Sequence, residues 1–340
     1  MTDWTEFLQR QGARMAADGT VASFGETPGD YPRLAAANLL FALDDRGLVS
    51  LEGPDTDKLL QGQLTCDMAA ITADQPGSGA LCTPKGRMLA NVTLYRAGEQ
   101  TRLVSHRALA QSLLDTLKKY AVFYKTRLAD ASGAVRVLGI AGPDASTLAA
   151  EQCAGAPGEC DLVALSPGRA LLVVAVDRAE AVWTRLAARA TPAGVPLWTL
   201  LAIRDGQGEV GPETLEEFIP QMLNLQHTGA VSFRKGCYTG QEIVARMQYL
   251  GKLKRRMYRL AIPTADVPAP GAEIVVAAGG ANVGHVVMAA PSTGESGELL
   301  AVLTAEAAAA DSLVIAGRPT PIRVLPLPYD DALNPQDAGG

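Results

Sequence analysis

The chain has 340 residues, of which 48% are apolar and 19% charged, a globular composition that excludes disordered and collagen-like chains. Its formal charge of −6 gives no general attraction to phosphate backbones or acidic membranes, so any contact with nucleic acid must be local. Five scattered cysteines without a C-x-x-C pair suit reduced thiols in a cytosol better than a secreted disulfide framework.

No segment has the pattern of a membrane span or a signal peptide. The longest clean apolar run, residues 170–176, is far shorter than the roughly 20 residues that cross a bilayer. Residues 1–7 have no cationic segment followed by an apolar core. We therefore expect a cytoplasmic protein without membrane contacts.

The first 250 residues are predicted to form two α+β modules. After a loose N-terminal segment, residues 1–35, a weak repeat begins: residues 48–55 and 137–144 each run from a strand through Gly-Pro-Asp into a helical pattern whose first position is proline. A further strand and helix follow each copy. We expect one module over residues 36–130 and a second, facing it, over 131–250. The alternative is that the tripeptide recurs by chance.

From residue 251 onward, short β-rich runs alternate with Gly and Pro. This pattern predicts a small antiparallel β-barrel over residues 251–329, followed by a tail at 330–340. The alanine run 305–310 is predicted to be a short helix or a loop. The expected strands are residues 256–262, 273–277, 283–290, 298–304, 312–316 and 322–327.

The strongest chemical signal surrounds Cys237. Residues 239–242, Thr-Gly-Gln-Glu, have the pattern of a capping box at a helix start, and Gly251 stands where a helix C-terminal glycine is expected. Cys237 lies two residues before the expected N-cap and beside Arg234 and Lys235, which favours the thiolate. The flanking glycines, Gly236 and Gly240, would let the backbone fold around the sulfur. The alternative is an inert cysteine buried in a turn.

The possible partners of this thiol are few. His227 is ten residues upstream of Cys237, and a structural role in a loop is the simpler interpretation for it. A stable metal site normally needs three or four ligands, and no second cysteine lies within 70 residues of Cys237. Transient ligation, redox exchange or a covalent adduct remain.

Two further features allow both a functional and a structural interpretation. Trp198 offers a flat face to a pterin or a base, although a core position is the default for tryptophan. A basic run without acids is either a solvated face or a contact for phosphates. It contains Arg246, Lys252, Lys254, Arg255, Arg256 and Arg259.

Residues 235–242, Lys-Gly-Cys-Tyr-Thr-Gly-Gln-Glu, resemble the signature of the folate-binding YgfZ family, relatives of the glycine-cleavage T-protein that serve iron–sulfur cluster assembly. Weaker matches follow the family's order at residues 53–55, 61–65, 83–87, 118–121 and 219–221 and at Asn224. The resemblance implies an α+β fold of two facing ferredoxin-like-type modules around a central folate channel, with a C-terminal antiparallel β-barrel.

The resemblance also implies roles for individual residues. Cys237 and Lys235 would carry the chemistry, and Trp198, Gln221 and Asn224 would bind tetrahydrofolate or a derivative. No stable metal is implied, but Cys237 would transiently ligate iron. The remaining motif residues are Gly236, Tyr238, Gly240, Gln241, Glu242 and Arg246. The sequence departs from its relatives at Arg46, where some carry a second tryptophan, and at 204–206, Arg-Asp-Gly, where the T-protein has Glu-Ala-Gly.

The resemblance implies a helper protein for iron–sulfur assembly factors and their client enzymes, including tRNA-methylthiolating radical enzymes. The alternative is a folate-dependent aminomethyl- or methyltransferase. The T-protein has an acid where this chain has Ala90 and Asn91, and Asp67 and Asp205 are the possible substitutes. Direct RNA binding through the basic run after Arg246 is a third hypothesis, which the acidic net charge disfavours.

Overall fold

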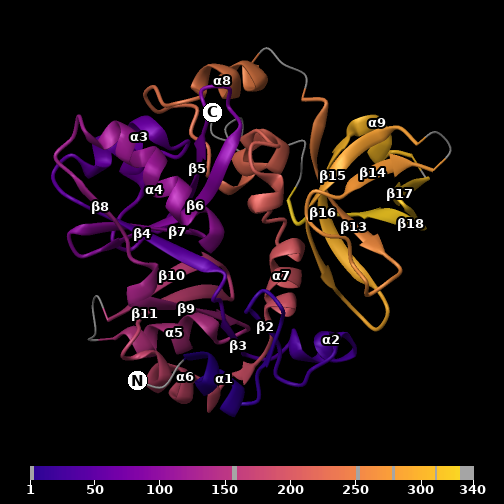
Figure 1. Cartoon of the computed structure of the whole chain (residues 1–340), viewed down its shortest axis with the longest axis horizontal. Coiled ribbons are helices and arrows are strands. Elements are labelled where there is room, and N and C mark those ends of the chain that lie inside the picture. The colour runs from indigo at the N-terminus through magenta and orange to yellow at the C-terminus, as the bar shows by residue number, and fades with distance from the viewer. Residues whose placement is uncertain (1–3, 155–158, 250–252, 278–279, 311, 330–340) are drawn as a thin grey trace. The chain divides into compact units, whose positions relative to one another are not determined.

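The computed structural model describes residues 4–154, 159–249, 253–277, 280–310 and 312–329 (Figure 1). The chain forms two compact units. The first contains residues 1–56, 69–77 and 93–198, and the second contains residues 57–68, 78–92 and 199–340. The expected tail at 330–340 lies outside the described residues, as do Leu250, Gly251 and Lys252.

The first unit contains a mixed five-stranded sheet with its own core. The strand order is β10 (Cys160–Ser166), β11 (Arg169–Ala175), β9 (Val135–Ala141), β3 (Leu39–Ala42) and β12 (Thr191–Pro192), and β12 runs parallel to β3. The helices α5 (Ala145–Cys153) and α6 (Ala179–Ala187) pack on this sheet. Their apolar side chains surround the fully buried Trp183.

The expectation that residues 1–35 form a loose segment is corrected by this core. The helix α1 (Trp4–Arg10) places Trp4, Phe7 and Leu8 on one face, which is buried, and the Trp4 ring meets the Trp183 ring edge to face at 5.9 Å. The i, i+3, i+4 spacing of Trp4, Phe7 and Leu8 is typical of an amphipathic helix, but three apolar residues are too few to predict a helix from the sequence. The remaining elements here are β1 (Arg14–Met15), β2 (Val21–Ser23), η1 (Pro28–Asp30) and α2 (Tyr31–Leu34).

A second five-stranded sheet has the order β5 (Gly77–Cys82), β6 (Met88–Ala97), β7 (Gln100–His106), β4 (Arg46–Glu52) and β8 (Arg127–Asp130). The helix α4 (Arg107–Ala121) packs on β4 and β8. Its buried face contains Leu109, Leu113 and Leu117, the residues whose helical spacing predicted it.

The element order predicted for the two repeats is confirmed. In the first copy, β4 leads through Gly53-Pro-Asp to α3 (Thr56–Gln63), and in the second, β9 leads through Gly142-Pro-Asp to α5. Both glycines adopt a positive φ, 140° for Gly53 and 127° for Gly142. The prediction that proline is the first helical residue is wrong in both copies. Pro54 and Pro143 lie in turns, and α3 and α5 begin two residues later, at Thr56 and Ala145.

The predicted C-terminal barrel is confirmed. Its six strands close in the order β13 (Arg255–Ile262), β16 (Gly297–Thr304), β15 (Asn282–Pro291), β14 (Glu273–Val276), β17 (Leu313–Ile315) and β18 (Arg318–Leu325) (Figure 1). Alternating strand residues such as Leu260, Leu299 and Ala301 fill the interior. The alanine run begins with the short helix α9 (Ala305–Ala308), and the hydroxyl of Thr304 accepts a hydrogen bond from the backbone N–H of Ala307.

The helix α7 (Val195–Arg204) and several short helices connect these parts. The short helices are η2 (Met68–Ala70), η3 (Ser132–Ala134), η4 (Pro212–Thr214), η5 (Pro220–Leu223) and η6 (Leu225–Thr228). Within the described ranges, no helix is both long and apolar enough to cross a membrane.

The expectation that every cysteine is reduced is wrong for one pair. Cys153 ends α5 and Cys160 begins β10, and their Cα atoms lie 4.9 Å apart, so that the two form a disulfide. The seven-residue spacing carries no such signal, because the reversal of the chain between helix and strand brings the two residues together. Cys66, Cys82 and Cys237 have free thiols.

Candidate functional site

The segment around Cys237 is held along residues 62–66 by a ladder of hydrogen bonds. The backbone N–H of Thr239 donates to the carbonyl oxygen of Gly62 at 3.1 Å, and that of Ser232 donates to the carbonyl oxygen of Thr65 at 2.9 Å. The hydroxyl of Thr65 donates to the carbonyl oxygen of Ala230 at 2.6 Å. Two separate sequence motifs, residues 61–65 and 235–242, therefore form one structural unit.

Lys235 contributes the central contacts of this unit. Its side chain is only 8% exposed, and its Nζ atom donates to the carbonyl oxygens of Leu64 and Cys66, both at 2.7 Å. The ammonium also lies 5.0 Å from the centre of the Tyr238 ring. Burial lowers the pKa of Lys235 to about 8. A neutral amine has two N–H bonds, which is enough for both carbonyls.

These contacts show Lys235 in a role that differs from the expected one. We expected a free cation beside the thiol of Cys237, but the ammonium anchors the motif to residues 64–66. Any effect of Lys235 on Cys237 therefore stays a prediction. Sequence reasoning also missed Cys66, whose carbonyl is one of the two acceptors and whose thiol is buried. Burial raises the pKa of Cys66 to about 11, although the charge of Lys235 opposes this.

Cys237 differs from the other free cysteines in its exposure. Cys66 and Cys82 are buried, and burial raises the pKa of Cys82 to about 12, whereas Cys237 is exposed. A buried position for Cys237 is therefore excluded, while its reactivity stays a prediction. Across the residues that the structure describes, no group of three or more His, Cys, Asp or Glu side chains is arranged to hold a metal ion.

The expected capping box is not formed. The helix α8 (Gln241–Tyr249) begins two residues after Thr239, whose hydroxyl donates to Oε1 of Gln63 at 3.2 Å. Glu242 faces Arg246 one turn later at 2.7 Å. The Thr239 hydroxyl thus bonds to Gln63, and the Glu242 carboxylate pairs with Arg246. Neither side chain makes the capping hydrogen bond to the helix backbone that the pattern predicted.

The two motif glycines differ in what they permit. Gly240 has a φ of +86°, and a Cβ there would lie 2.6 Å from the carbonyl oxygen of Thr83, so that a side chain would separate α8 from the turn at residues 83–86. Gly236 has open space around it and no positive φ. The expectation of a tight backbone on both sides of the sulfur is therefore wrong at Gly236.

Trp198, one of the three residues expected to bind folate, is 3% exposed. The guanidinium carbon of Arg169 lies 4.2 Å from the centre of its ring, and the Phe41 ring lies at 5.2 Å. The ring also lies close to Gly139, where a Cβ would come within 2.8 Å of it. These contacts leave little of the tryptophan face free for a ligand.

Gln221 and Asn224, the other two, are also buried. Asn224 has a φ of +57°, and its Nδ2 donates to the carbonyl oxygen of Met257 at 3.0 Å, which ties η5 to β13. Gln221 donates through Nε2 to the carbonyl oxygen of Val244 in α8. Its Oε1 is buried and has no hydrogen-bond partner among the described residues. The Oε1 atom of Gln221 is therefore a buried acceptor of the kind that accepts an N–H group of a pterin.

The positions compared with the acid of the T-protein have structural roles. Asn91 donates to the carbonyl oxygen of Gly208 at 3.1 Å and accepts from the backbone N–H of Val210 at 2.9 Å, so that it clamps this loop. Ala90 is buried. Asp67 accepts a hydrogen bond from Gln61 at 3.0 Å. Arg46, at the place of a second tryptophan, lies 3.4 Å from Asp45.

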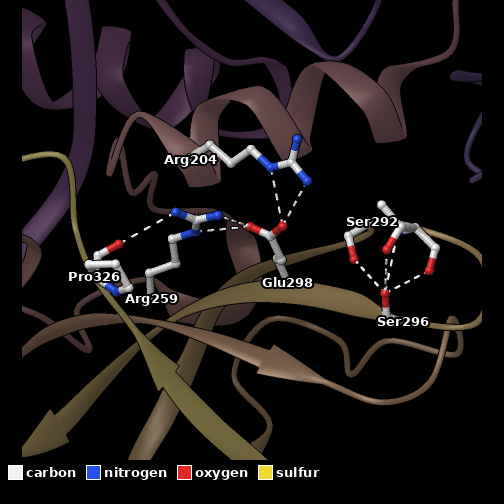
Figure 2. Close-up of polar contacts among 7 residues, drawn as sticks. Arg204, Arg259, Ser292, Ser296, Glu298 and Pro326 are labelled. Atoms are coloured by element: carbon white, nitrogen blue, oxygen red, sulfur yellow. Dashed lines mark hydrogen bonds and ion pairs between the residues drawn. The ribbon is translucent and has the colours of Figure 1, made fainter. Parts of the chain in front are cut away.

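Arg204, in the turn that differs from the T-protein, is engaged by the barrel. Glu298 accepts from Arg204 at 2.8 Å and, through its other oxygen, from Arg259 at 2.6 Å (Figure 2). Burial alone would raise the pKa of Glu298, but the hydrogen bonds and charges of the two arginines outweigh it and hold the pKa below its ordinary value. The three side chains form an ion-pair network, in which the carboxylate of Glu298 is largely shielded from solvent.

Three of the six cations in the basic run from Arg246 to Arg259 are engaged in such contacts, and the side chains of Lys254 and Arg255 have no partner among the described residues. Arg246 pairs with Glu242, Arg259 pairs with Glu298, and Nε of Arg256 donates to the hydroxyl of Tyr258 at 2.9 Å. Lys252 lies outside the described residues. The run therefore does not form one continuous free cationic face.

Comparison with known proteins agrees with this fold. Residues 35–161 match the family model described as the GCVT N-terminal domain. The fold is similar to the crystal structure of the glycine cleavage system aminomethyltransferase T from Bartonella henselae, with a TM-score of 0.77 and 19% identity over 96% of each chain.

The sequence is 39% identical to the tRNA-modifying protein YgfZ of Yersinia pseudotuberculosis serotype O:1b (strain IP 31758) over 257 residues, which cover 72% of this chain and 78% of that protein. It is 38% identical, with the same coverage, to the tRNA-modifying protein YgfZ of Yersinia enterocolitica serotype O:8 / biotype 1B (strain NCTC 13174 / 8081). At this identity and coverage, the chain belongs to the YgfZ family.

Proposed function

We propose that this chain is a cytoplasmic, folate-binding accessory protein that supports the assembly or repair of iron–sulfur clusters, including those of enzymes that methylthiolate tRNA. The observation that carries the proposal is the contrast at Cys237: its thiol is exposed, while Lys235 and Tyr238 on either side of it are buried. Buried neighbours on both sides therefore flank one accessible thiol. The link to tRNA modification comes from the names of its relatives.

In this proposal, Cys237 acts as a temporary ligand. Its thiol loses a proton to solvent, and the thiolate replaces an exchangeable ligand on iron without electron transfer. When a partner thiolate replaces it in turn, Cys237 returns to its starting state. A single exposed thiol suits this role, because stable cluster binding normally needs four ligands.

Tetrahydrofolate, when bound, would supply the capacity to carry a one-carbon group. Gln221 is the residue that we propose to hold it, since Oε1 can accept an N–H of the pterin and Nε2 remains bonded to Val244. The clamp formed by Asn91 supports a helper over an aminomethyltransferase, because this amide is committed to Gly208 and Val210 and cannot serve as an acid.

The thiol is tested in cells that lack this protein. They are complemented with the wild type, with Cys237→Ser and with Arg14→Ala, an exposed residue far from Cys237 in the chain, at equal protein levels. We expect the wild type and the Arg14 control to restore methylthiolated tRNA and one unrelated iron–sulfur enzyme, and Cys237→Ser to restore neither. Full restoration by the serine variant would overturn the role of Cys237.

Folate binding is tested by calorimetry with purified protein and tetrahydrofolate. Gln221→Leu should weaken binding by roughly 5- to 10-fold, the cost of one neutral hydrogen bond, while Gln248→Leu should leave it unchanged. Thermal melting of each variant establishes that it is folded. Absence of binding to the wild type would remove folate from the proposal and leave the thiol role standing.

A further inference from the structure

A second surface with its own chemistry lies at residues 118–127, which we call the Lys118–Arg127 surface. Its sequence, Lys-Lys-Tyr-Ala-Val-Phe-Tyr-Lys-Thr-Arg, contains four cationic and three aromatic residues and no acid, in a chain of which 5% is aromatic. It comprises the last turn of α4, the loop that follows and the first residue of β8. β8 ends its sheet, so that no described strand covers its outer edge.

The apolar part of this surface is unusually exposed. Phe123 is 81% exposed and Val122 is 75% exposed, the highest values among the exposed large apolar residues of the described chain. The Phe123 ring makes no ring contact with another described residue. Single exposed apolar residues are common on protein surfaces, but a free phenyl ring beside a second exposed apolar side chain marks an interaction site.

The cationic part is not used by the protein itself. Lys118, Lys119, Lys125 and Arg127 are all exposed, and none of their side chains has an ion pair or hydrogen bond with a described residue. Two acids lie beside this loop: Asp55 accepts the backbone N–H of Lys125 at 3.0 Å, and Glu52, the β4 neighbour of Arg127 in the sheet, accepts a hydrogen bond from Gln100 at 3.1 Å. An open pocket adjoins the loop, and its lining includes Tyr124, Lys125 and Arg127 together with Glu52 and Gly53.

We propose that the Lys118–Arg127 surface binds a single-stranded segment of RNA. Each nucleotide of a single strand offers a flat base, which stacks on an exposed aromatic ring, and a phosphate, which pairs with a free cation. Phe123 supplies the stacking face, and the four cations flank it in sequence on both sides. Because the net charge of the chain is −6, any contact with nucleic acid must be local, and this surface concentrates four cations without an acid in ten residues.

Two other partners fit less well. An anionic membrane would meet the same cations, but two apolar side chains bury too little area for stable anchoring. An acidic protein segment would also meet the cations, but it needs no free aromatic stacking face. The inference uses no residue of the Cys237 loop, so its test is independent of the proposed function.

The test is a fluorescence anisotropy titration of the full-length protein with a labelled oligouridylate of about twelve nucleotides, within the usual site size of single-strand binders. We expect binding that weakens steeply with salt. Phe123→Ala should weaken it roughly 5- to 150-fold, the cost of one lost stacking contact, while Phe123→Trp should retain it. The double variant Lys118→Ala/Lys119→Ala should reduce the slope of log K against log salt by about 1.4.

The controls are matched for chemistry. Arg14→Ala removes an exposed cation elsewhere, and Val176→Ala trims a side chain that is 37% exposed; both should leave binding unchanged within about twofold. All these side chains are exposed, so melting temperatures should not change. No binding at low salt, or equal binding by Phe123→Ala and the wild type, overturns the proposal. Phe123-dependent binding to vesicles of phosphatidylglycerol, or to oligoglutamate, without RNA binding overturns it in favour of a membrane or a protein.

Discussion

Two cation-rich stretches of this protein, residues 235–259 and residues 118–127, look similar in sequence and differ in structure. In the first, Lys235, Arg246, Arg256 and Arg259 each have a partner within the protein, whereas the side chains of Lys254 and Arg255 have none among the described residues. In the second, Lys118, Lys119, Lys125 and Arg127 have none within the described ranges.

The difference shows that the number of cations in a stretch says little about ligand binding. A cation whose charge is already compensated by a carboxylate or by carbonyls must break those contacts before it binds a phosphate, and that cost cancels most of the gain. A free, solvated cation has no such cost. The stretch that sequence alone suggested for RNA is therefore the less suitable of the two.

The largest effect on stability is expected when Glu298, the partner of Arg259 in the first stretch, is removed. Glu298→Ala should lower the free energy of unfolding by about 3–5 kcal/mol, because Arg204 and Arg259 lose a shared, poorly exposed partner. Chemical denaturation measures this loss. Glu295→Ala, an exposed acid on the same barrel, should change it by less than about 0.5 kcal/mol. Equal effects of the two substitutions would show that the triad is not coupled to stability.

A smaller loss is expected at Lys235. Lys235→Met should cost about 2–3 kcal/mol, because the carbonyls of Leu64 and Cys66 lose their donor in a buried position. The release of a buried charge offsets part of the effect. Arg234→Met, on the exposed neighbour, is the control, and denaturation curves compare them. If Lys235→Met left the free energy of unfolding unchanged, water would be replacing the ammonium as donor to the two carbonyls without cost.

The pKa values of the two buried groups are both lowered, so both groups make stability rise with pH, in two separate pH ranges. The pKa of Glu298 is held below its ordinary value of 4.5, so its contribution is present above that pH and is lost as the pH falls through the lower folded value. The pKa of Lys235 is lowered from 10.5 to about 8, so the unfolded state binds more protons between these values and stability rises with pH there.

Melting temperatures across pH test both signs. Glu298→Gln should flatten the acid limb below pH 4.5, and Lys235→Met should remove the rise between pH 8 and 10.5. An unchanged acid limb in Glu298→Gln, or an unchanged rise in Lys235→Met, would contradict the pKa direction of that group.

The smallest effect on stability is expected in the second stretch. Lys119→Ala should change the free energy of unfolding by less than about 0.5 kcal/mol, since the side chain is exposed and has no ion pair in the part of the chain that the structure describes. Chemical denaturation compares this variant with Arg259→Ala, whose free energy of unfolding should fall several times more. A loss of more than 1 kcal/mol in Lys119→Ala would mean that this stretch is internally bonded as well.

Much of the fold could be predicted from sequence, because local patterns carried it. The barrel strands followed from short apolar runs between Gly and Pro, and α4 followed from the spacing of Leu109, Leu113 and Leu117. The errors arose where tertiary contacts outweighed local ones. Trp4 and Phe7 pack into the core, so that the segment expected to be loose forms a buried helix. The Thr239 hydroxyl, which would form the capping box, bonds to Gln63 instead.

The sequence by itself determined the order of elements, the thiol candidate at Cys237 and the family resemblance, since each depends on neighbouring residues or on a short motif. Only the tertiary structure decided that Lys235 bonds to residues 64 and 66, that Cys153 pairs with Cys160, and which cations are free. The physical reason is that ion pairs, buried hydrogen bonds and disulfides join residues that are distant in the chain or separated by a reversal of its direction. Local pattern contains no information about these distances.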